Sequence, residues 1–531
     1  MDAALGFLLI IFPIILALVL LVFLHKAADT TGVVVWLVTV LIAVFAFQTD
    51  FTVALIASVA GIVNSFPISL MVATSILMMT YMQETGALQR LIVFFKTLGG
   101  GSRPMQIMMI SLGLGLFLVG IGATPVSMLP PVMLALGFSP LVAVALPAIG
   151  YDPLTTFALL GVPAAVFRDT YSAVSGSTVT LSEAGSVFAL YMPVVTTGIA
   201  VSMLWIAGGR KLLVQKEGLL LAGICGVTAG VVAIVCNTTI VNQTTLTNVF
   251  AGAAVMLVLF VYNRARKRPI IDKSVLTEKD IAVQQSLSLT RASIPWLILV
   301  ALCLVTNLIP WVKDLLYNQL PMGIAIDGYP RTINTRVLWQ AYTLMFIATL
   351  ASIPFLKRDR TTLKNTLVRF AKRSPRPVLA AAIFFAMAEV MNYSGYFVNA
   401  GVWTFPVDPS NNMIYLLATA TSSTLGAAYP LTAAFLGLLA GFISGSETSA
   451  IAMFTKYHYQ ASTLIGANSM VVAASNGIGG GLASVLSPAK IQNAAAVIDQ
   501  IGIEGQVIRY GVVVAVLMTA VVAVMTMLWA F

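Results

Sequence analysis

The sequence has little charge and little cysteine. Charged residues make up 9% of its 531 residues and hydrophobic residues 59%, whereas a soluble domain carries about 25% charged residues. Its three cysteines, Cys225, Cys236 and Cys303, lie far apart, without CxxC or histidine-adjacent spacing. That pattern gives no disulfide framework and no metal site. The composition is that of an integral membrane protein.

Acidic residues are fewer than basic ones, which leaves a net charge of +10. The basic residues cluster in short loops beside no soluble module, so we expect no nucleic-acid partner. By the positive-inside rule the basic loops 208–216, 264–292 and 357–376 are expected in the cytoplasm. The intervening segments 237–247 and 312–336 are then outside; the first is uncharged and the second carries both signs. We therefore expect a multi-pass protein of a prokaryotic plasma membrane.

Apolar runs that approach the ~20 residues a bilayer requires predict about 12–14 transmembrane helices. Residues 5–24 lack a basic n-region and a small-residue cleavage site, so we interpret them as a retained first helix. Further spans are predicted at 33–48, 67–83, 105–122, 187–207, 217–236, 248–263, 294–311, 337–356, 377–393, 412–427, 429–444, 459–475 and 507–530. Pieces interrupted by glycine and proline are expected to form re-entrant hairpins or half-helices at 125–138, 139–150, 153–166 and 478–498.

The two halves of the chain resemble each other at a constant offset of 325 residues. Five residues carry this repeat, Gly120, Thr124, Met128, Ala158 and Pro163, which recur as Gly445, Ser449, Met453, Ala483 and Pro488. Interrupted helices in corresponding positions of repeated halves are typical of secondary transporters. We predict an all-α polytopic membrane protein with two inverted repeats at about 30–200 and 340–510.

The breaks of the two repeats are expected to meet near the membrane midplane, at 120–125, 150–153, 445–449 and 475–481. Along the chain we distinguish an N-terminal half (1–263), a charged cytoplasmic linker (264–292) and a C-terminal half (293–531). The linker is too short to be a domain.

Polar residues gather at these breaks within apolar sequence. An unsatisfied polar group facing hydrocarbon costs several kcal/mol, so these residues are expected to line a wet cavity. Ser446 and Thr448 can cap a half-helix and aim its amides at an anion. The predicted substrate-binding residues are Ser446, Thr448, Asn476, Ser487, Tyr151, Asn392, Ser394 and Lys490. Lys490 is the best-placed cation for a carboxylate, although it could instead extend to the membrane surface.

Three carboxylates at apparent membrane depth are candidates for proton coupling: Asp152, Glu389 and Glu447. Burying such a group costs about 2.5 kcal/mol or more, so each is a functional candidate. Desolvation favours the neutral carboxyl and so permits proton exchange. We expect Glu389 to be either a second proton carrier or a partner for Lys490. The alternative for Glu447 is an ordinary helix cap at the membrane surface.

At these residues the sequence resembles the lactate permease family. The resemblance is carried by Asn392-Tyr-Ser-Gly, Gly445-Ser-Glu-Thr-Ser, Asn476 with Gly479-Gly480, Leu486-Ser-Pro and Leu136-Gly-Phe-Ser-Pro140. It implies a proton-coupled symporter of small 2-hydroxy monocarboxylates such as L-lactate or glycolate, with scaffold and transport domains. It also favours Glu447 as the proton carrier. The chain departs from the family pattern near Val119, where a typical glutamate is missing, and at Asp152 and Glu389, which are added acids.

Other functions are open at this point. A sodium-coupled carboxylate carrier or a sodium/proton antiporter would use the same architecture, with hydroxyls and carbonyls binding Na⁺. An enzyme with a Ser446/Lys456 dyad has no support from spacing, and a channel would distribute its polar residues along a continuous path. We expect no cofactor other than the coupling ion H⁺, or alternatively Na⁺. The expected partners are a small carboxylate, the lipid bilayer and, as a further option, a second copy of the chain.

Overall fold

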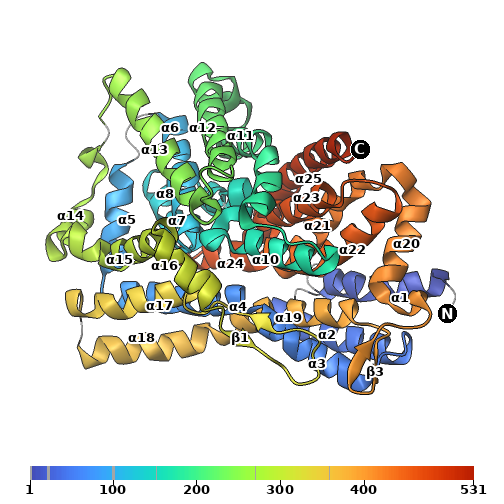
Figure 1. Cartoon of the computed structure of the whole chain (residues 1–531). Coiled ribbons are helices and arrows are strands. Elements are labelled where there is room, and N and C mark those ends of the chain that lie inside the picture. The colour runs from blue at the N-terminus through green and yellow to red at the C-terminus, as the bar shows by residue number, and fades with distance from the viewer. Residues whose placement is uncertain are drawn as a thin grey trace.

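The computed structural model describes residues 3–20, 24, 26–98, 102–150, 152–269, 271–357, 359–500 and 502–531. The fold is helical almost throughout (Figure 1). The N-terminal half contains α1 (Ala3–Leu18), α2 (Ala28–Phe45), α3 (Phe51–Asn64), α4 (Phe66–Glu84), α5 (Ala87–Thr97), α6 (Arg103–Ile107), α7 (Gly115–Gly120), α8 (Pro125–Ala135), α9 (Pro140–Ile149), α10 (Ala158–Ser175), α11 (Leu181–Val214), α12 (Lys216–Cys236) and α13 (Thr247–Ala265).

The C-terminal half and the linker before it are also mainly helical. The linker contains α14 (Glu278–Ser286) and the start of α15 (Leu289–Leu308). The helices that follow are α16 (Pro310–Asp314), α17 (Ala341–Ser352), α18 (Arg360–Arg373), α19 (Pro375–Asn392), α20 (Met413–Leu425), α21 (Pro430–Ser444), α22 (Glu447–Leu464), α23 (Ser469–Leu482), α24 (Pro488–Val497) and α25 (Glu504–Trp529). Two small antiparallel hairpins pair β1 (Gly323–Ile324) with β2 (Ile333–Asn334) and β3 (Phe397–Asn399) with β4 (Val402–Thr404).

Ten helical stretches of the described chain are long and apolar enough to cross a membrane, and six shorter apolar helices accompany them. Large apolar side chains on their outer faces are exposed, as on α12 at Leu219, Val227 and Val231. In water such a surface would be unfavourable, whereas lipid accommodates it. The predicted class, an all-α polytopic membrane protein, is confirmed.

The helices form two layers. Along the lower edge of Figure 1, α19 packs on α2 and α3, while α17 and α18 pack on α4. The larger upper part contains the helices from α6 to α13 and from α20 to α25, in which α11 packs on α12, and α23 packs on α21 and α22. Each layer takes helices from both halves of the sequence. The halves therefore interlock, and their division at the linker stays a prediction.

The repeat is visible in where the helices are interrupted. In the first half α7 ends at Gly120 and α8 begins at Pro125; 325 residues further on, α21 ends at Ser444 and α22 begins at Glu447. A second pair of breaks also corresponds. The backbone turns left-handed over 159–161, with φ of 55°, 60° and 75°, and α23 gives way to a 3₁₀ turn over Ser484–Leu486. The inverted orientation of the two repeats stays a prediction.

The predicted break at 475–481 is wrong, because α23 continues through it to Leu482. A Cβ on Gly479 would lie 1.9 Å from the Ala434 carbonyl oxygen, and one on Gly480 would lie 2.7 Å from the Ala450 Cβ. These glycines let α21 and α22 approach α23 closely, which is how small residues serve helix pairs in membranes. The predicted span 459–475 is also wrong, since α22 ends at Leu464 and α23 begins at Ser469.

Gly479→Ala tests this packing function. The added methyl group collides with backbone of α21, and overpacking of this kind costs about 1–3 kcal/mol. We expect a lower midpoint of thermal unfolding in detergent. The matched control is Gly223→Ala on α12, where an added Cβ meets nothing within 4 Å. Equal midpoints for the two variants would show that α23 does not depend on this close approach.

The charged linker 264–292 is folded against the rest of the chain. Within it, α14 contacts α5 through an ion pair of 2.7 Å between Lys96 Nζ and Asp280 Oδ1. The backbone N–H of Asp272 donates to the Thr97 carbonyl at 2.9 Å. In Figure 1, α14 and α18 lie at the left, whereas the β3–β4 hairpin lies at the lower right. The cytoplasmic location of the linker stays a prediction.

Candidate functional site

The breaks of the two halves meet at Glu447, the first residue of α22. The chain turns into this helix through Gly445, whose φ is 70°, and Ser446 caps the helix by accepting the N–H of Ser449 at 3.3 Å. The Glu447 side chain is only 3% exposed. Its Oε1 accepts a hydrogen bond of 2.5 Å from Thr156 Oγ1 of the first half. The alternative of a helix cap at the membrane surface is therefore wrong.

Asp152 and Lys490 lie beside Glu447. Asp152 begins the 3₁₀ segment Asp152–Phe157 and is buried, and its carboxylate lies beside the hydroxyl of Ser484. Lys490 Nζ donates to the buried Ser484 Oγ at 2.9 Å. Its positive charge acts on both Asp152 and Glu447. Lys490 thus reaches a buried hydroxyl and not the membrane surface.

We call Asp152, Glu447 and Lys490 the buried charge cluster. Its three charged groups come from three interrupted segments, one in the first repeat and two in the second. Two more predicted residues lie close to it. Ser487 Oγ is 3.0 Å from the position that a Cβ on Gly445 would occupy, and Thr448 is buried next to Glu447 in the first turn of α22. The tertiary structure therefore brings together six predicted residues, Ser446, Glu447, Thr448, Asp152, Ser487 and Lys490.

The other predicted residues lie elsewhere. Asn476 is fully buried between α22 and α23, where its side-chain amide donates to the Ala450 carbonyl at 3.1 Å. Ser394 joins α19 to α20 by accepting the Met413 N–H at 2.7 Å. Tyr151 lies outside the described residues. A substrate contact for these residues stays a prediction.

Glu389 forms a second polar centre on α19. Its Oε1 accepts from Tyr329 Oη at 2.7 Å and from Asn64 Nδ2 at 2.9 Å. The Arg331 guanidinium adds an ion pair at 3.2 Å, and Asn392 Nδ2 donates to Oε2 at 3.1 Å. The expected pairing of Glu389 with Lys490 is wrong, because the loop between α16 and α17 supplies Arg331 in its place.

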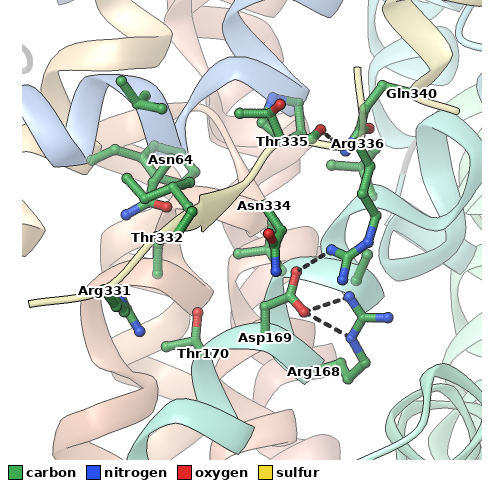
Figure 2. Close-up of a pocket in the computed structure, with 18 of the residues that line it drawn as sticks. Asn64, Arg168, Asp169, Thr170, Arg331, Thr332, Asn334, Thr335, Arg336 and Gln340 are labelled. Carbon is green, nitrogen blue, oxygen red and sulfur yellow. Dashed lines mark hydrogen bonds and ion pairs between the residues drawn. The ribbon is translucent and has the colours of Figure 1, made fainter. Parts of the chain in front are cut away.

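Sequence reasoning did not find two sets of residues. Thr156 and Ser484, which bond the buried charge cluster, are ordinary hydroxyls without a distinctive pattern. Arg168 and Asp169 gave a signal that could have been used, namely two adjacent charges in an otherwise apolar stretch. They line a cavity of about 250 Å³ together with Arg331, Arg336 and Glu389. Figure 2 shows Asp169 between the guanidinium groups of Arg168 and Arg336.

Interrupted membrane helices that meet at buried ionisable groups define the class of secondary transporters. The chain belongs to the L-lactate permease family, whose sequence model matches residues 6–531. It is 24% identical to the glycolate permease GlcA of Escherichia coli K12, over 98% of this chain and 94% of that protein. It is 22% identical to an L-lactate permease of Halalkalibacterium halodurans, over 93% and 90%. The expected family is confirmed.

The similarity to the L-lactate permease of Escherichia coli K12 is local. The two are 26% identical over 223 residues, which are 42% of this chain and 37% of that permease. These relatives are named as permeases, which supports the expectation of a transporter over that of an enzyme.

Proposed function

We propose that this protein is a proton-coupled secondary transporter that takes up small 2-hydroxy monocarboxylates such as L-lactate or glycolate. The observation that carries the proposal is the buried charge cluster, where broken helices of both halves bring Asp152, Glu447 and Lys490 together. The names of the relatives, L-lactate permease and glycolate permease, support the substrate class.

The charges of the cluster provide a physical reason for coupling. With both carboxylates ionised, two negative groups face the single positive charge of Lys490, and an incoming anion is repelled. One proton on Glu447 removes this excess negative charge. The N–H groups in the first turn of α22 and the ammonium of Lys490 then favour a substrate carboxylate. Proton and anion therefore bind best together, which is the requirement for symport.

Four hydroxyl and ammonium groups near the cluster are suited to bind the substrate: Ser446, Thr448, Ser487 and Lys490. A small anion stripped of water needs several such donors, and charge-assisted hydrogen bonds are the strongest available. We also propose that the protein lies in the plasma membrane, that its basic loops lie in the cytoplasm, and that it forms a homodimer. Sodium coupling is the alternative, and no contact in the described structure favours it over protons.

Counterflow in proteoliposomes tests the proposal directly. Vesicles loaded with unlabelled L-lactate or glycolate are expected to take up labelled L-lactate, while loading with propionate, which lacks the hydroxyl, supports less exchange. A pH gradient, acidic outside, should drive accumulation, and a Na⁺ gradient should not. Absence of exchange with every small carboxylate would contradict the substrate class, and accumulation driven only by Na⁺ would contradict proton coupling.

A further inference from the structure

The cavity described above lies between the two layers and outside the buried charge cluster. One wall comes from α3 and α19, the opposite wall from α10, and the segment 331–340 covers it (Figure 2). We call it the outer pocket, because it is covered by the segment that loop charge predicts to lie outside the membrane. Its volume of about 250 Å³ is slightly below the range of about 300–1,000 Å³ that holds drug-sized ligands. A small carboxylate is a suitable size for it.

The charges of the outer pocket favour one monoanion. Its ionisable residues are three arginines and two acids, Arg168, Arg331, Arg336, Asp169 and Glu389. Three positive charges minus two negative charges leave one positive charge. Asp169 accepts from Arg168 Nε at 2.9 Å and pairs with Arg336 Nη1 at 3.4 Å. Arg336 Nε also donates to the Tyr317 carbonyl at 3.3 Å. Both contacts of Arg336 are longer than that of Arg168 Nε, and a carboxylate can bind the planar fork of its guanidinium.

Polar atoms of the pocket residues match the remaining groups of a 2-hydroxy acid. Tyr317 Oη and Trp339 Nε1 are buried donors without a hydrogen-bond partner among the described residues, and Gln340 Oε1 is an acceptor in the same condition. The Tyr317 ring lies 4.5 Å from the Arg336 guanidinium and 5.2 Å from that of Arg168. A buried polar group left unpaired costs about 1–3 kcal/mol. These three atoms are themselves covered by neighbouring atoms, so the side chains must turn toward the cavity before a carboxylate with a neighbouring hydroxyl satisfies both donors and the acceptor.

The outer pocket is connected to the buried charge cluster by two helices. Val162 and Ala165 of α10 line the pocket, and α10 follows the segment that contains Thr156. Ala452 of α22 also lines it, about 7.5 Å along the helix axis from Glu447 by the helical rise per residue. An anion held here is therefore one to two helical turns away from the cluster.

We propose that the outer pocket is a separate carboxylate-binding site, in which Arg336, Tyr317 and Trp339 capture the substrate from the outside before it moves to the buried charge cluster. This inference rests on the proposed function, since it takes the transported 2-hydroxy monocarboxylate as the ligand. Such a site acts only on the outer face. A substitution in this site should therefore change the KM at the two membrane faces unequally, whereas a substitution in the buried charge cluster should affect both faces.

The test measures initial uptake of labelled L-lactate by right-side-out and inside-out membrane vesicles that contain the full-length chain. Arg336→Gln is expected to raise the KM at the outer face by at least about tenfold, because a hydrogen bond to a charged group is lost. Tyr317→Phe is expected to raise it about threefold or more, since a neutral hydrogen bond is worth less. The KM at the inner face and the maximal rate of uptake should stay unchanged in both variants. Because a carrier cannot shift the equilibrium of its substrate, the maximal rate of efflux should then fall by the same factor as the outer KM rises.

Tyr342→Phe is the matched control. Its hydroxyl is also buried without a partner among the described residues, but Tyr342 does not line the outer pocket. An unchanged outer KM in both Arg336→Gln and Tyr317→Phe, with active wild type, would overturn the outer site alone. Equal changes of KM at both faces would also overturn it. Wild-type vesicles that transport no small carboxylate would refute the proposed function, and with it the premise of this site.

Discussion

Proteoliposomes that contain Glu447→Gln are expected to lose accumulation driven by a pH gradient while they retain exchange of labelled for unlabelled substrate. Glutamine has the size of glutamate and still offers an oxygen to the Thr156 hydroxyl, so the hydrogen bond across the two halves is kept. It cannot bind and release a proton. Exchange needs no net proton movement, whereas accumulation does.

The expected size of this effect follows from the driving force. A gradient of one pH unit is worth about 1.4 kcal/mol for each coupled proton, which corresponds to about tenfold accumulation. For Glu447→Gln the ratio of internal to external substrate should remain near unity under the same gradient. Accumulation and exchange are measured in the same vesicle preparation, so loss of both would indicate a damaged protein and not a specific loss of coupling.

Glu389→Gln extends the test to a candidate carboxylate outside the buried charge cluster. Glu389 is also buried, but it is bonded to Arg331, Asn64 and Tyr329. None of these three groups belongs to the buried charge cluster, so we expect this variant to accumulate substrate under a pH gradient. If Glu447→Gln, Asp152→Asn and Glu389→Gln all still accumulate substrate under a pH gradient alone, proton coupling through these carboxylates is wrong.

Lys490→Met is expected to reduce transport at least about 100-fold and to lower the midpoint of thermal unfolding, since a buried charge that loses its compensating partner costs about 3–5 kcal/mol. Methionine is close to lysine in length but leaves Asp152 and Glu447 without their cation. Transport is measured as initial uptake, and stability is measured separately in detergent.

The double variant Asp152→Asn with Lys490→Met tests whether the loss of stability in Lys490→Met comes from unbalanced charge or from the changed shape of the side chain. Asp152→Asn removes one of the two carboxylates that Lys490→Met leaves without a cation. The unfolding midpoint of the double variant should therefore return toward that of the wild type. Together with the single variant Asp152→Asn, the two measurements complete a double-mutant cycle that gives the coupling energy between the two residues. A Lys490→Met protein that unfolds like the wild type would show that Lys490 does not stabilise the buried carboxylates.

Composition and periodicity alone determined the class of this protein. Too few charges are present for a soluble domain, and the apolar runs are long enough for membrane helices, so an all-α polytopic fold was predictable. The 325-residue offset also located the breaks near Gly120 and Gly445, because polar residues inside apolar sequence must be sheltered from lipid. Asp152, Glu447 and Lys490 were found by the same argument.

Tertiary packing decided what these residues contact. From sequence alone, the glycines at 477–481 are compatible with a flexible break and also with a close helix contact. The neighbouring backbone of α21 shows that they allow a close helix contact. Glu389 was expected near Lys490, but the loop that carries Arg331 folds over it. The outer pocket combines residues more than 100 positions apart, such as Asp169 and Arg336. Local sequence fixes helix propensity and burial, whereas ion pairs between distant segments depend on how the helices pack, and no local pattern encodes that arrangement.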